Sequence, residues 1–385
     1  MTLGLQSALS RKVLVCVGSG GVGKTTVSAA LALEAASRGK KVLVCTIDPA
    51  RRLANSMGLA GLTNEETRIG DEALAAVPAP VPGALYAMML DLKRSWDEVI
   101  ARHAPDPAKR QAILENKFYQ QLSTALAGSQ EYVAMEKLYA LYRGGQYDLV
   151  VLDTPPTSNA LDFLDAPNRM IDFLDSDAAR WFSAGAVSSA GRVGLRMFQA
   201  GSAYAGKVLA RFTGQGTLEE LGRFLGALGG MYQGFKERAA AVKALLASDQ
   251  AAFVVVTSPS PLPMEEAQHF HQLLTRARMP VAAVVANRVN ADRLAGGAVD
   301  RSAIERAALA VRAPGVPGLS GLGVRLADTL ADAQVMAQLD RAQLDRLRAR
   351  LAPTPVCAVP RFDHDVHDLS GLWSVDRALF DDPPQ

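Results

Sequence analysis

The most constraining feature of the sequence is the stretch from Gly18 to Thr26, which reads GSGGVGKTT. It follows the apolar run Val13–Val17 and precedes an alanine- and leucine-rich run that begins at Val27. This order of buried strand, glycine loop and helix start is the one that a phosphate-binding P-loop requires, and the match to G-x-x-x-x-G-K-[ST] is complete. A glycine-rich turn before an unrelated helix is the alternative, which the Lys-Thr pair disfavours. The sequence therefore predicts a nucleoside triphosphate site.

The residue types in this stretch suit the charge of a triphosphate. Glycines let consecutive backbone N–H groups point inward without a clash from Cβ, which makes a concave anion site at the positive end of a helix. The Lys24 side chain would reach the β- and γ-phosphates, and the Thr25 hydroxyl would complete a Mg²⁺ shell. The predicted nucleotide-binding residues here are Gly20, Gly21, Val22, Gly23, Lys24, Thr25 and Thr26.

Composition and charge argue against several other classes of protein. With 49% hydrophobic and 21% charged residues, this chain of 385 residues has the composition of a globular protein with an ample core. The net charge of +2 gives no general argument for binding nucleic acid or an anionic membrane. Residues 1–10 lack a signal-peptide pattern, and no apolar run reaches the roughly 18–20 residues of a spanning helix. We therefore expect a cytoplasmic protein whose membrane contact is only indirect and that binds no nucleic acid.

Cysteine usage agrees with that expectation. Cys16, Cys45 and Cys357 lie far apart and form no C-x-x-C pair, so the sequence has no zinc or redox signature. Two of them lie in strand-like apolar runs, as small buried hydrophobic residues do. Such thiols suit a reducing cytoplasm.

Two aspartates follow predicted buried strands, where open α/β sheets bind their ligands. Asp153 follows the apolar run Leu149–Leu152, a Walker B pattern that brings a carboxylate to the Mg²⁺ side of the site. Asp48 follows the run Lys41–Ile47 and precedes Pro49. Two interpretations fit Asp48, a catalytic group and a cap for the next helix with proline at its first position. The two roles are compatible.

Strands and helices alternate along the chain, which predicts one α/β domain over residues 1–385 with a mainly parallel, doubly wound sheet flanked by helices. Residues 60–83 have the character of a surface loop. Residues 161–248 are helical in pattern without an obvious strand, so we expect an α-helical insertion subdomain there. The expected strands are Lys12–Gly18, Lys41–Ile47, Ala84–Asp91, Tyr147–Asp153, Ala251–Ser258, Val281–Asn287 and Pro355–Val359.

The clearest helix of the insertion is expected from Thr217 to about Ala247. Glycines recur there every four residues and would form one ridge without side chains, a ladder made of Gly222, Gly226, Gly230 and Gly234. Each glycine in a helix costs about 1 kcal/mol against alanine, so close approach of another element would have to offset the ladder. Two interpretations fit, tight packing inside the subdomain and a groove for an apolar client.

The stretch from Gly18 to Thr26 resembles the deviant Walker A motif of the arsenite-pump and tail-anchored-protein-targeting ATPases (ArsA/Get type), which reads G-K-G-G-V-G-K-T-[ST]. The departure is Ser19, where the family has its signature lysine. Residues 48–53, DPARRL, resemble the switch I motif D-P-A-H-[SN]-L, with Arg51 and Arg52 departing. Residues 153–162 keep part of the switch II motif D-T-A-P-T-G-H-T-L-R. The chain is therefore similar to this family over nearly its whole length.

The resemblance implies an enzyme and its cofactors. It implies a P-loop ATPase that uses ATP and Mg²⁺, works as a dimer, and lets its nucleotide state control a helical subdomain that holds a hydrophobic protein client. In the family's mechanism Lys24 would hold phosphate charge and Asp48 would orient or polarise the attacking water. Thr25 and Asp153 would be on the Mg²⁺ side.

The resemblance also assigns residues to the base of the nucleotide. Asn287, in the run VVANRV, corresponds to a family asparagine that reads the purine edge. An asparagine in a strand-to-loop turn is the plainer interpretation. Pro360 and Phe362 lie where a family loop packs around the adenine.

Ser19 leaves more than one mechanism open. In the family, the signature lysine reaches across the dimer to the partner's phosphates, and a serine supplies neither that charge nor that length. Three outcomes follow: slow hydrolysis, compensation by Arg51 or Arg52, or a heterodimer in which a related lysine-bearing subunit acts on this chain's ATP. A second hypothesis is a nucleotide-gated binding or scaffold subunit with little intrinsic hydrolysis. A ParA/MinD-like positioning ATPase fits poorly because of the long insertion.

Overall fold

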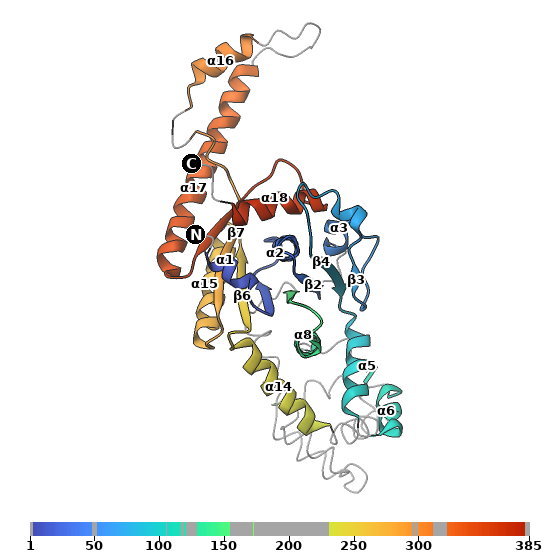
Figure 1. Ribbon diagram of the computed structural model, residues 1–385. Helices are drawn as coiled ribbons and strands as arrows, with labels where there is room; N and C mark the ends of the chain where they lie inside the picture. Colours follow the sequence, from blue (N-terminus) through green and yellow to red (C-terminus); the bar gives the residue numbers. More distant parts are fainter. Residues whose placement is uncertain are drawn as a thin grey trace, which may run out of the picture.

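The chain folds around a central sheet, shown in Figure 1. The computed structural model describes residues 3–47, 52–104, 106–116, 119–120, 129–154, 172, 231–294, 297, 299–310 and 322–381. Within them the strands are β1 (Val13–Val17), β2 (Lys41–Thr46), β3 (Thr67–Arg68), β4 (Ala84–Met89), β5 (Leu149–Asp153), β6 (Ala251–Thr257), β7 (Val281–Val289) and β8 (Val356–Pro360).

In the described part of the chain these strands form an 8-stranded sheet in the order β3-β4-β2-β5-β1-β6-β7-β8. Every pairing is parallel except that of β3 with β4, which is antiparallel. Strand β1 lies between β5 and β6, so the sheet extends from β1 in both directions. The predicted doubly wound α/β fold is confirmed. The carboxyl end of β1 is the switch point at which such sheets bind ligands.

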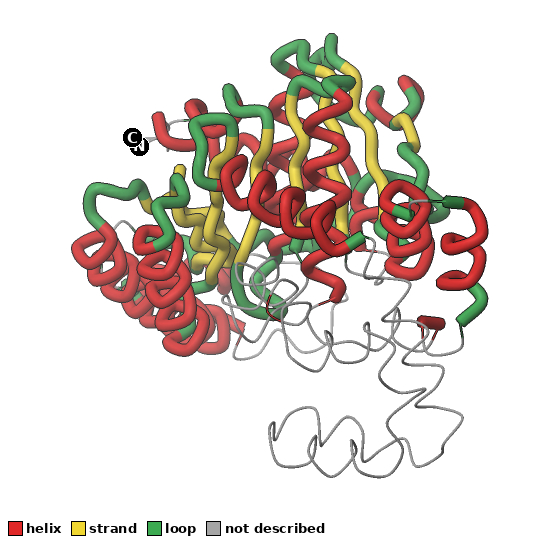
Figure 2. Tube along the Cα trace, turned by 90° about the horizontal axis from the view of Figure 1, so that it is seen from below, coloured by secondary structure: helices red, strands yellow, loops and turns green. Residues whose placement is uncertain are grey.

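Helices cover both faces of the sheet, as Figures 1 and 2 show. One face packs against α5 (Leu92–His103), α8 (Ser129–Gly144), α14 (Tyr232–Leu246), α15 (Pro261–Arg276) and α17 (Leu322–Leu351). The other packs against α1 (Leu3–Leu9), α2 (Lys24–Ser37), α3 (Arg52–Ser56) and α18 (Leu369–Phe380). The remaining described helices are α4 (Asp71–Leu74), α6 (Pro107–Leu114) and α16 (Arg301–Ala310). Of these three, α16 packs on α17. Among the described residues, no helix is long and apolar enough to cross a membrane.

The central strands β1, β5 and β6 are buried at every position. A parallel sheet that is covered on both faces leaves these strands no solvent side, so their sequences are continuous apolar runs without alternation. Polar residues and glycine begin at the carboxyl edge, where Gly18 follows β1 and where Asp153 and Thr257 end β5 and β6. The polar residues at the ends of these buried strands therefore lie together at the carboxyl edge of the sheet.

Two parts of the fold differ from the sequence expectations. Residues 60–83, expected to be a surface loop, contain β3 and α4, so that expectation is wrong for these two elements. A short strand suits its place at the end of the sheet, because it leaves few unpaired backbone groups exposed. Helix α18, which was not expected, lies across α2 and next to β8.

Helix α14 (Tyr232–Leu246) begins after a turn at Met231, so the helix expected from Thr217 to about Ala247 is interrupted at that residue. The part of the expected helix before Met231 lies outside the described residues. Glycine is a poor residue for a helix interior, which explains a helix start within the glycine ladder. A Cβ on Gly234 would lie 3.0 Å from His103 Nδ1 on α5, so this glycine allows α5 and α14 to pack closely. The other ladder positions lie outside the described residues, at Gly222, Gly226 and Gly230.

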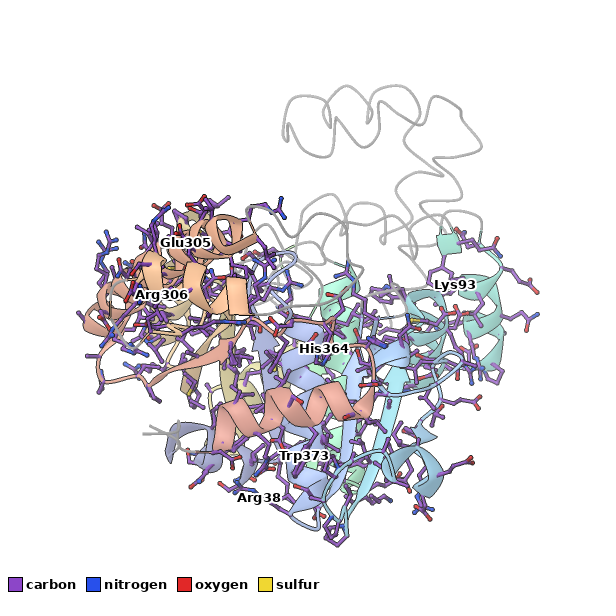
Figure 3. All side chains as sticks on the ribbon, turned by 90° about the horizontal axis from the view of Figure 1, so that it is seen from above. Arg38, Lys93, Glu305, Arg306, His364 and Trp373 are labelled. Carbon is purple, nitrogen blue, oxygen red and sulfur yellow. The ribbon has the colours of Figure 1, made fainter. Side chains whose placement is uncertain are left out.

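A cluster of charges around two buried carboxylates joins α18 to α2, the two helices that Trp373 and Arg38 mark in Figure 3. The Glu34 carboxylate accepts hydrogen bonds from Arg38 Nε at 2.7 Å and from Arg377 Nη2 at 2.8 Å. Asp376 is fully buried and accepts from the same Arg377 nitrogen at 2.8 Å. Burial raises the pKa of Asp376 to about 7, and the charge of Glu34 adds to the shift. The folded protein therefore favours the neutral form of this acid.

Replacing this acid by its amide, Asp376→Asn, is expected to raise the free energy of unfolding near pH 8 by about 1–3 kcal/mol. In the wild type the unfolded chain loses the Asp376 proton near its ordinary pKa of 3.8, whereas the folded chain keeps it to about 7. The wild type thus loses stability as pH rises through this window, and the amide does not titrate. Urea unfolding at several pH values measures the difference. Asp381→Asn, which alters an exposed partner of Arg377, is the control. Equal pH slopes for wild type and Asp376→Asn would contradict the prediction.

Candidate functional site

The loop between β1 and α2 requires glycine at two of its positions. Gly18 has a φ of 152°, and a Cβ there would lie 2.1 Å from the Val256 carbonyl oxygen. Gly23 has a φ of 92°, and a Cβ there would lie 2.2 Å from Asn287 Nδ2. Among the residues that the structure describes, no side-chain hydrogen bond caps the start of α2, and a helix N-terminus is a favourable place for an anion. The loop therefore has the backbone of a phosphate cradle.

Lys24 lies inside this loop. Its side chain is buried, and Nζ donates hydrogen bonds to the carbonyl oxygens of Gly18 at 2.9 Å and Ser19 at 2.8 Å. A buried ammonium group needs acceptors because its desolvation is costly. Loop carbonyls supply them here, and phosphate oxygens would offer stronger ones.

Asp153 brings three elements together at the carboxyl edge of the sheet. It is fully buried at the end of β5, and its register partners are Cys16 on β1 and Thr46 on β2. Its Oδ2 accepts hydrogen bonds from Thr25 Oγ1 and from Thr46 Oγ1, each at 2.8 Å. Thr25 and Asp153, both expected on the Mg²⁺ side, are thus in direct contact, and their role toward the metal stays a prediction.

Hydroxyl and carboxylate oxygens are ligands that Mg²⁺ prefers, so the donor set of Thr25 and Asp153 fits that ion. Sequence reasoning missed Thr46, whose hydroxyl binds the same carboxylate oxygen. A polar residue at the end of the buried run KVLVCT was the available signal. Thr154 supports the arrangement, because its Oγ1 donates to the Cys16 carbonyl at 2.8 Å and ties β5 to β1.

The residues expected near the nucleotide base lie at the carboxyl edge of the sheet. Asn287 is on β7, Pro360 is the last residue of β8, and Phe362 comes just after β8. Asn287 is buried, and its Nδ2 donates to the Val22 carbonyl at 2.9 Å. Pro360 ends β8 and pairs in register with Val289, and the half-buried Phe362 follows it. The structure thus brings Asn287 into contact with the P-loop and sets Pro360 on the neighbouring strand.

The other residues singled out in the sequence are two that the structure does not describe and two that it places. Asp48 and Arg51 lie outside the described residues, and Arg52 opens α3 with an exposed side chain. Ser19 is nearly buried, and its hydroxyl has no hydrogen-bond partner in the part of the chain that the structure describes. The position that carries a lysine in the similar family is therefore a small uncharged side chain within the loop.

Comparison with known protein families agrees with this geometry. The family model for anion-transporting ATPases (ArsA) matches residues 11–306, a range that contains the P-loop, Asp153 and Asn287. The chain belongs to this family. The resemblance seen in the sequence motifs is thereby confirmed.

Individual ArsA-family relatives match a shorter part of the chain. ATPase GET3 from Malassezia globosa is 32% identical over 167 residues, which are 43% of this chain and 46% of that protein. The putative arsenical pump-driving ATPase 1 of Aquifex aeolicus is 30% identical over 168 residues, 41% of this chain and 39% of the relative. A putative arsenical pump-driving ATPase of Chlorobaculum tepidum is 31% identical over 159 residues, which are 41% of this chain and 36% of that protein. The matches span less than half the length of each of these relatives.

The thiols of this ArsA-family chain are all inside the protein. Cys16, Cys45 and Cys357 are buried and form no disulfide. Burial raises the pKa of Cys16 and that of Cys45 to about 12, so both stay protonated near neutral pH. These thiols are not presented as ligands for a soft metal or an arsenical.

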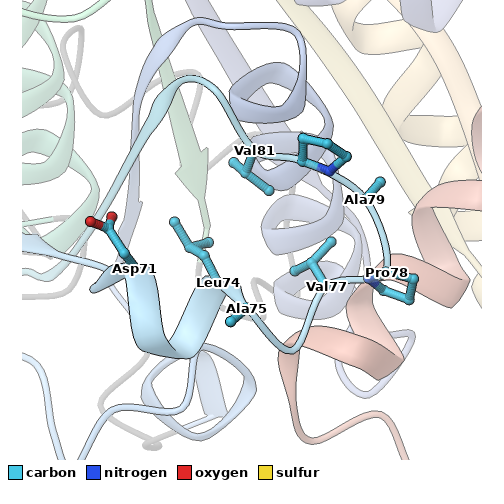
Figure 4. Close-up of a pocket in the computed structure, with 8 residues that line it drawn as sticks. Asp71, Leu74, Ala75, Val77, Pro78, Ala79 and Val81 are labelled. Atoms are coloured by element: carbon cyan, nitrogen blue, oxygen red, sulfur yellow. The ribbon is translucent and has the colours of Figure 1, made fainter.

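A separate surface hollow of about 400 Å³ lies at α4 and the loop that follows it, as Figure 4 shows. Its lining residues are Asp71, Leu74, Ala75, Val77, Pro78, Ala79, Pro80 and Val81. Asp71 is its single charged group, so the hollow lacks the convergent polar groups of a specific ligand site. The candidate site of this ATPase-family chain remains the P-loop edge of the sheet.

Proposed function

We propose that the chain is a Mg²⁺-dependent ATPase whose nucleotide state controls a helical client- or partner-binding subdomain in a dimer. The observation that carries the proposal is the contact of Thr25 and Thr46 with Asp153, beside Lys24 in a complete P-loop. The loop N–H groups and Lys24 would hold phosphate charge. Thr25 and Asp153 would hold Mg²⁺, which when bound neutralises charge on the phosphates.

Asp48 is proposed to position the attacking water. In the sequence it comes two residues after Thr46, the last residue of β2, whose hydroxyl donates to the Asp153 carboxylate. The proposed role is to hold this water for in-line attack on the γ-phosphate. Asn287, Pro360 and Phe362 are proposed to hold the adenine, because they lie at the same edge of the sheet as the P-loop.

The proposed controlled part is the helical insertion of residues 161–248. Strand β5 ends at Asp153 and leads into this segment, and α14 near its end packs against α8 and β6. A shift of Asp153 or its neighbours on nucleotide exchange would thus reach the insertion through a short connection. We propose that this subdomain binds a hydrophobic protein client and that the protein works in the cytoplasm. Although two relatives are named for arsenical pumps, the buried cysteines give no support to arsenical binding.

Equilibrium binding of ATP to the purified chain, with and without Mg²⁺, tests the nucleotide part of the proposal. We expect micromolar or tighter binding that improves when Mg²⁺ is present, because the ion joins the triphosphate to Thr25 and Asp153. The same titration with inorganic sulfate controls for simple anion binding. Absence of ATP binding under both conditions would exclude the proposed function.

A second candidate function is a nucleotide-gated binding or scaffold subunit that holds ATP without turning it over alone. Ser19 favours it, because this buried serine brings no cation to the loop position that carries the family lysine. Loss of a trans-acting cation can lower phosphoryl transfer by roughly 10³-fold or more. This subunit would bind ATP tightly, show no single-turnover hydrolysis, and gain hydrolysis when mixed with a lysine-bearing relative.

A further inference from the structure

Arg288, at the end of β7, has an unusual backbone conformation. Its φ is 62°, a left-handed value that is unfavourable for a residue with a Cβ. The β7–β8 register is also irregular between Ala286 and Val289, so Asn287 and Arg288 leave the regular ladder. Strained residues and bulges of this kind persist where surrounding contacts fix them, often beside functional sites.

Arg278 is the other described non-glycine residue with a positive φ, at 57°, and it has an ordinary explanation. It follows the end of α15, and its N–H donates to the Thr275 carbonyl at 3.0 Å. Left-handed residues commonly end helices in this way. Arg288 lies near the end of strand β7, not after a helix, so this explanation does not apply to it.

The contacts of Asn287 and Arg288 are to consecutive carbonyls of the P-loop. Asn287 Nδ2 donates to the Val22 carbonyl at 2.9 Å, and Arg288 Nη1 donates to the Gly21 carbonyl at 3.2 Å. Asn287 Oδ1 in turn accepts from the Arg288 N–H at 2.9 Å, which stabilises the turn. The end of β7 is therefore hydrogen-bonded to two consecutive carbonyl groups of the P-loop.

Fixing a carbonyl also fixes an N–H. In a trans peptide the C=O and the following N–H point in opposite directions within one rigid plane. Arg288, by holding the Gly21 carbonyl, therefore sets the direction of the Val22 N–H. Asn287, by holding the Val22 carbonyl, sets the direction of the Gly23 N–H. Both N–H groups then point away from β7, as a phosphate cradle needs.

We propose that Arg288 is a positioning residue of the P-loop, whose guanidinium holds the Gly21–Val22 peptide so that the Val22 N–H faces bound phosphate. This inference rests on the proposed nucleotide function of the same loop. It assigns a role to Arg288 that Asn287 alone cannot fill, because the two side chains hold different peptide planes. Two hydrogen bonds accompany the left-handed backbone at Arg288, from its N–H to Asn287 Oδ1 and from its guanidinium to the Gly21 carbonyl.

The test measures binding of ATP, ADP and tripolyphosphate to wild type and to Arg288→Asn and Arg288→Gly. Asparagine and glycine both tolerate a positive φ, so these variants remove the guanidinium without adding strain. We expect affinity for all three ligands to fall by a similar factor, about 5- to 20-fold, because each places phosphate on the loop N–H groups. Arg288→Lys, which keeps a cationic donor, should recover part of the affinity. The melting temperature without ligand should not fall.

Arg278→Gly is the matched control, because it changes an exposed arginine of similar φ far from the loop in sequence and contacts. It should bind all three ligands like wild type. Unchanged affinity in the Arg288 variants would overturn the inference, as would a loss that spares tripolyphosphate or that Arg278→Gly reproduces. Failure of the wild type to bind ATP would instead overturn the proposed function, and this inference with it.

Discussion

Replacing Lys24 with alanine is expected to lower ATP turnover about 10²- to 10³-fold and to weaken ATP binding strongly. The Lys24 ammonium is buried within the loop, where it donates to the carbonyls of Gly18 and Ser19. A cation held in a region with little water interacts strongly with phosphate charge, which is why its loss should be large. Single-turnover hydrolysis and ATP titration measure the two effects.

The control for this variant is Lys12→Ala. Lys12 precedes β1, whereas Lys24 follows it, and its exposed ammonium lies 4.0 Å from Asp148 at the opposite edge of the sheet. It should leave binding and turnover unchanged, because a surface ion pair of this kind contributes little. Full turnover by Lys24→Ala would show that phosphate is not held at this loop.

The second large effect is expected from Asp153→Asn. The substitution keeps size and one acceptor oxygen for Thr25 and Thr46, but removes the negative charge that would hold Mg²⁺. We expect Mg²⁺ to stop improving ATP affinity, and turnover at moderate Mg²⁺ to fall about 100-fold. ATP affinity measured in the presence of a chelator should stay close to that of wild type.

Asp148→Asn is the matched control, since Asp148 lies just before the other end of the same strand with an exposed side chain. It should keep the full Mg²⁺ dependence of both binding and turnover. An Asp153→Asn variant with a normal Mg²⁺ response would place the metal elsewhere. A large loss of thermal stability in that variant would instead mean that Asp153 acts mainly in packing β5 against β1 and β2.

The fold could be predicted because its central strands are buried on both sides. Continuous apolar runs such as Val13–Val17 and Leu149–Leu152 have few alternatives to a parallel sheet covered by helices. The P-loop could also be predicted from the sequence. Only glycine fits at positions 18 and 23, because a Cβ there would clash with Val256 and Asn287. Sequence patterns carry such steric requirements directly.

Other parts of the site depend on contacts between distant segments, which no local pattern encodes. Thr46 reaches Asp153 because β2 and β5 are neighbours in a particular register. Arg288 reaches Gly21 because an irregular end of β7 turns toward the loop. The interruption at Met231 was not expected either, because glycines weaken a helix in a way that apolar periodicity does not show.

The most direct test of the central claim is single-turnover hydrolysis of ATP by the purified chain, with Mg²⁺ and with a chelator. We predict Mg²⁺-dependent release of phosphate from the wild type, which Lys24→Ala lowers about 10²- to 10³-fold. That result would establish an ATPase that works with Ser19 in its P-loop. Tight ATP binding with no phosphate released, in the presence of Mg²⁺, would contradict the claim and leave a subunit that needs a partner's cation for chemistry.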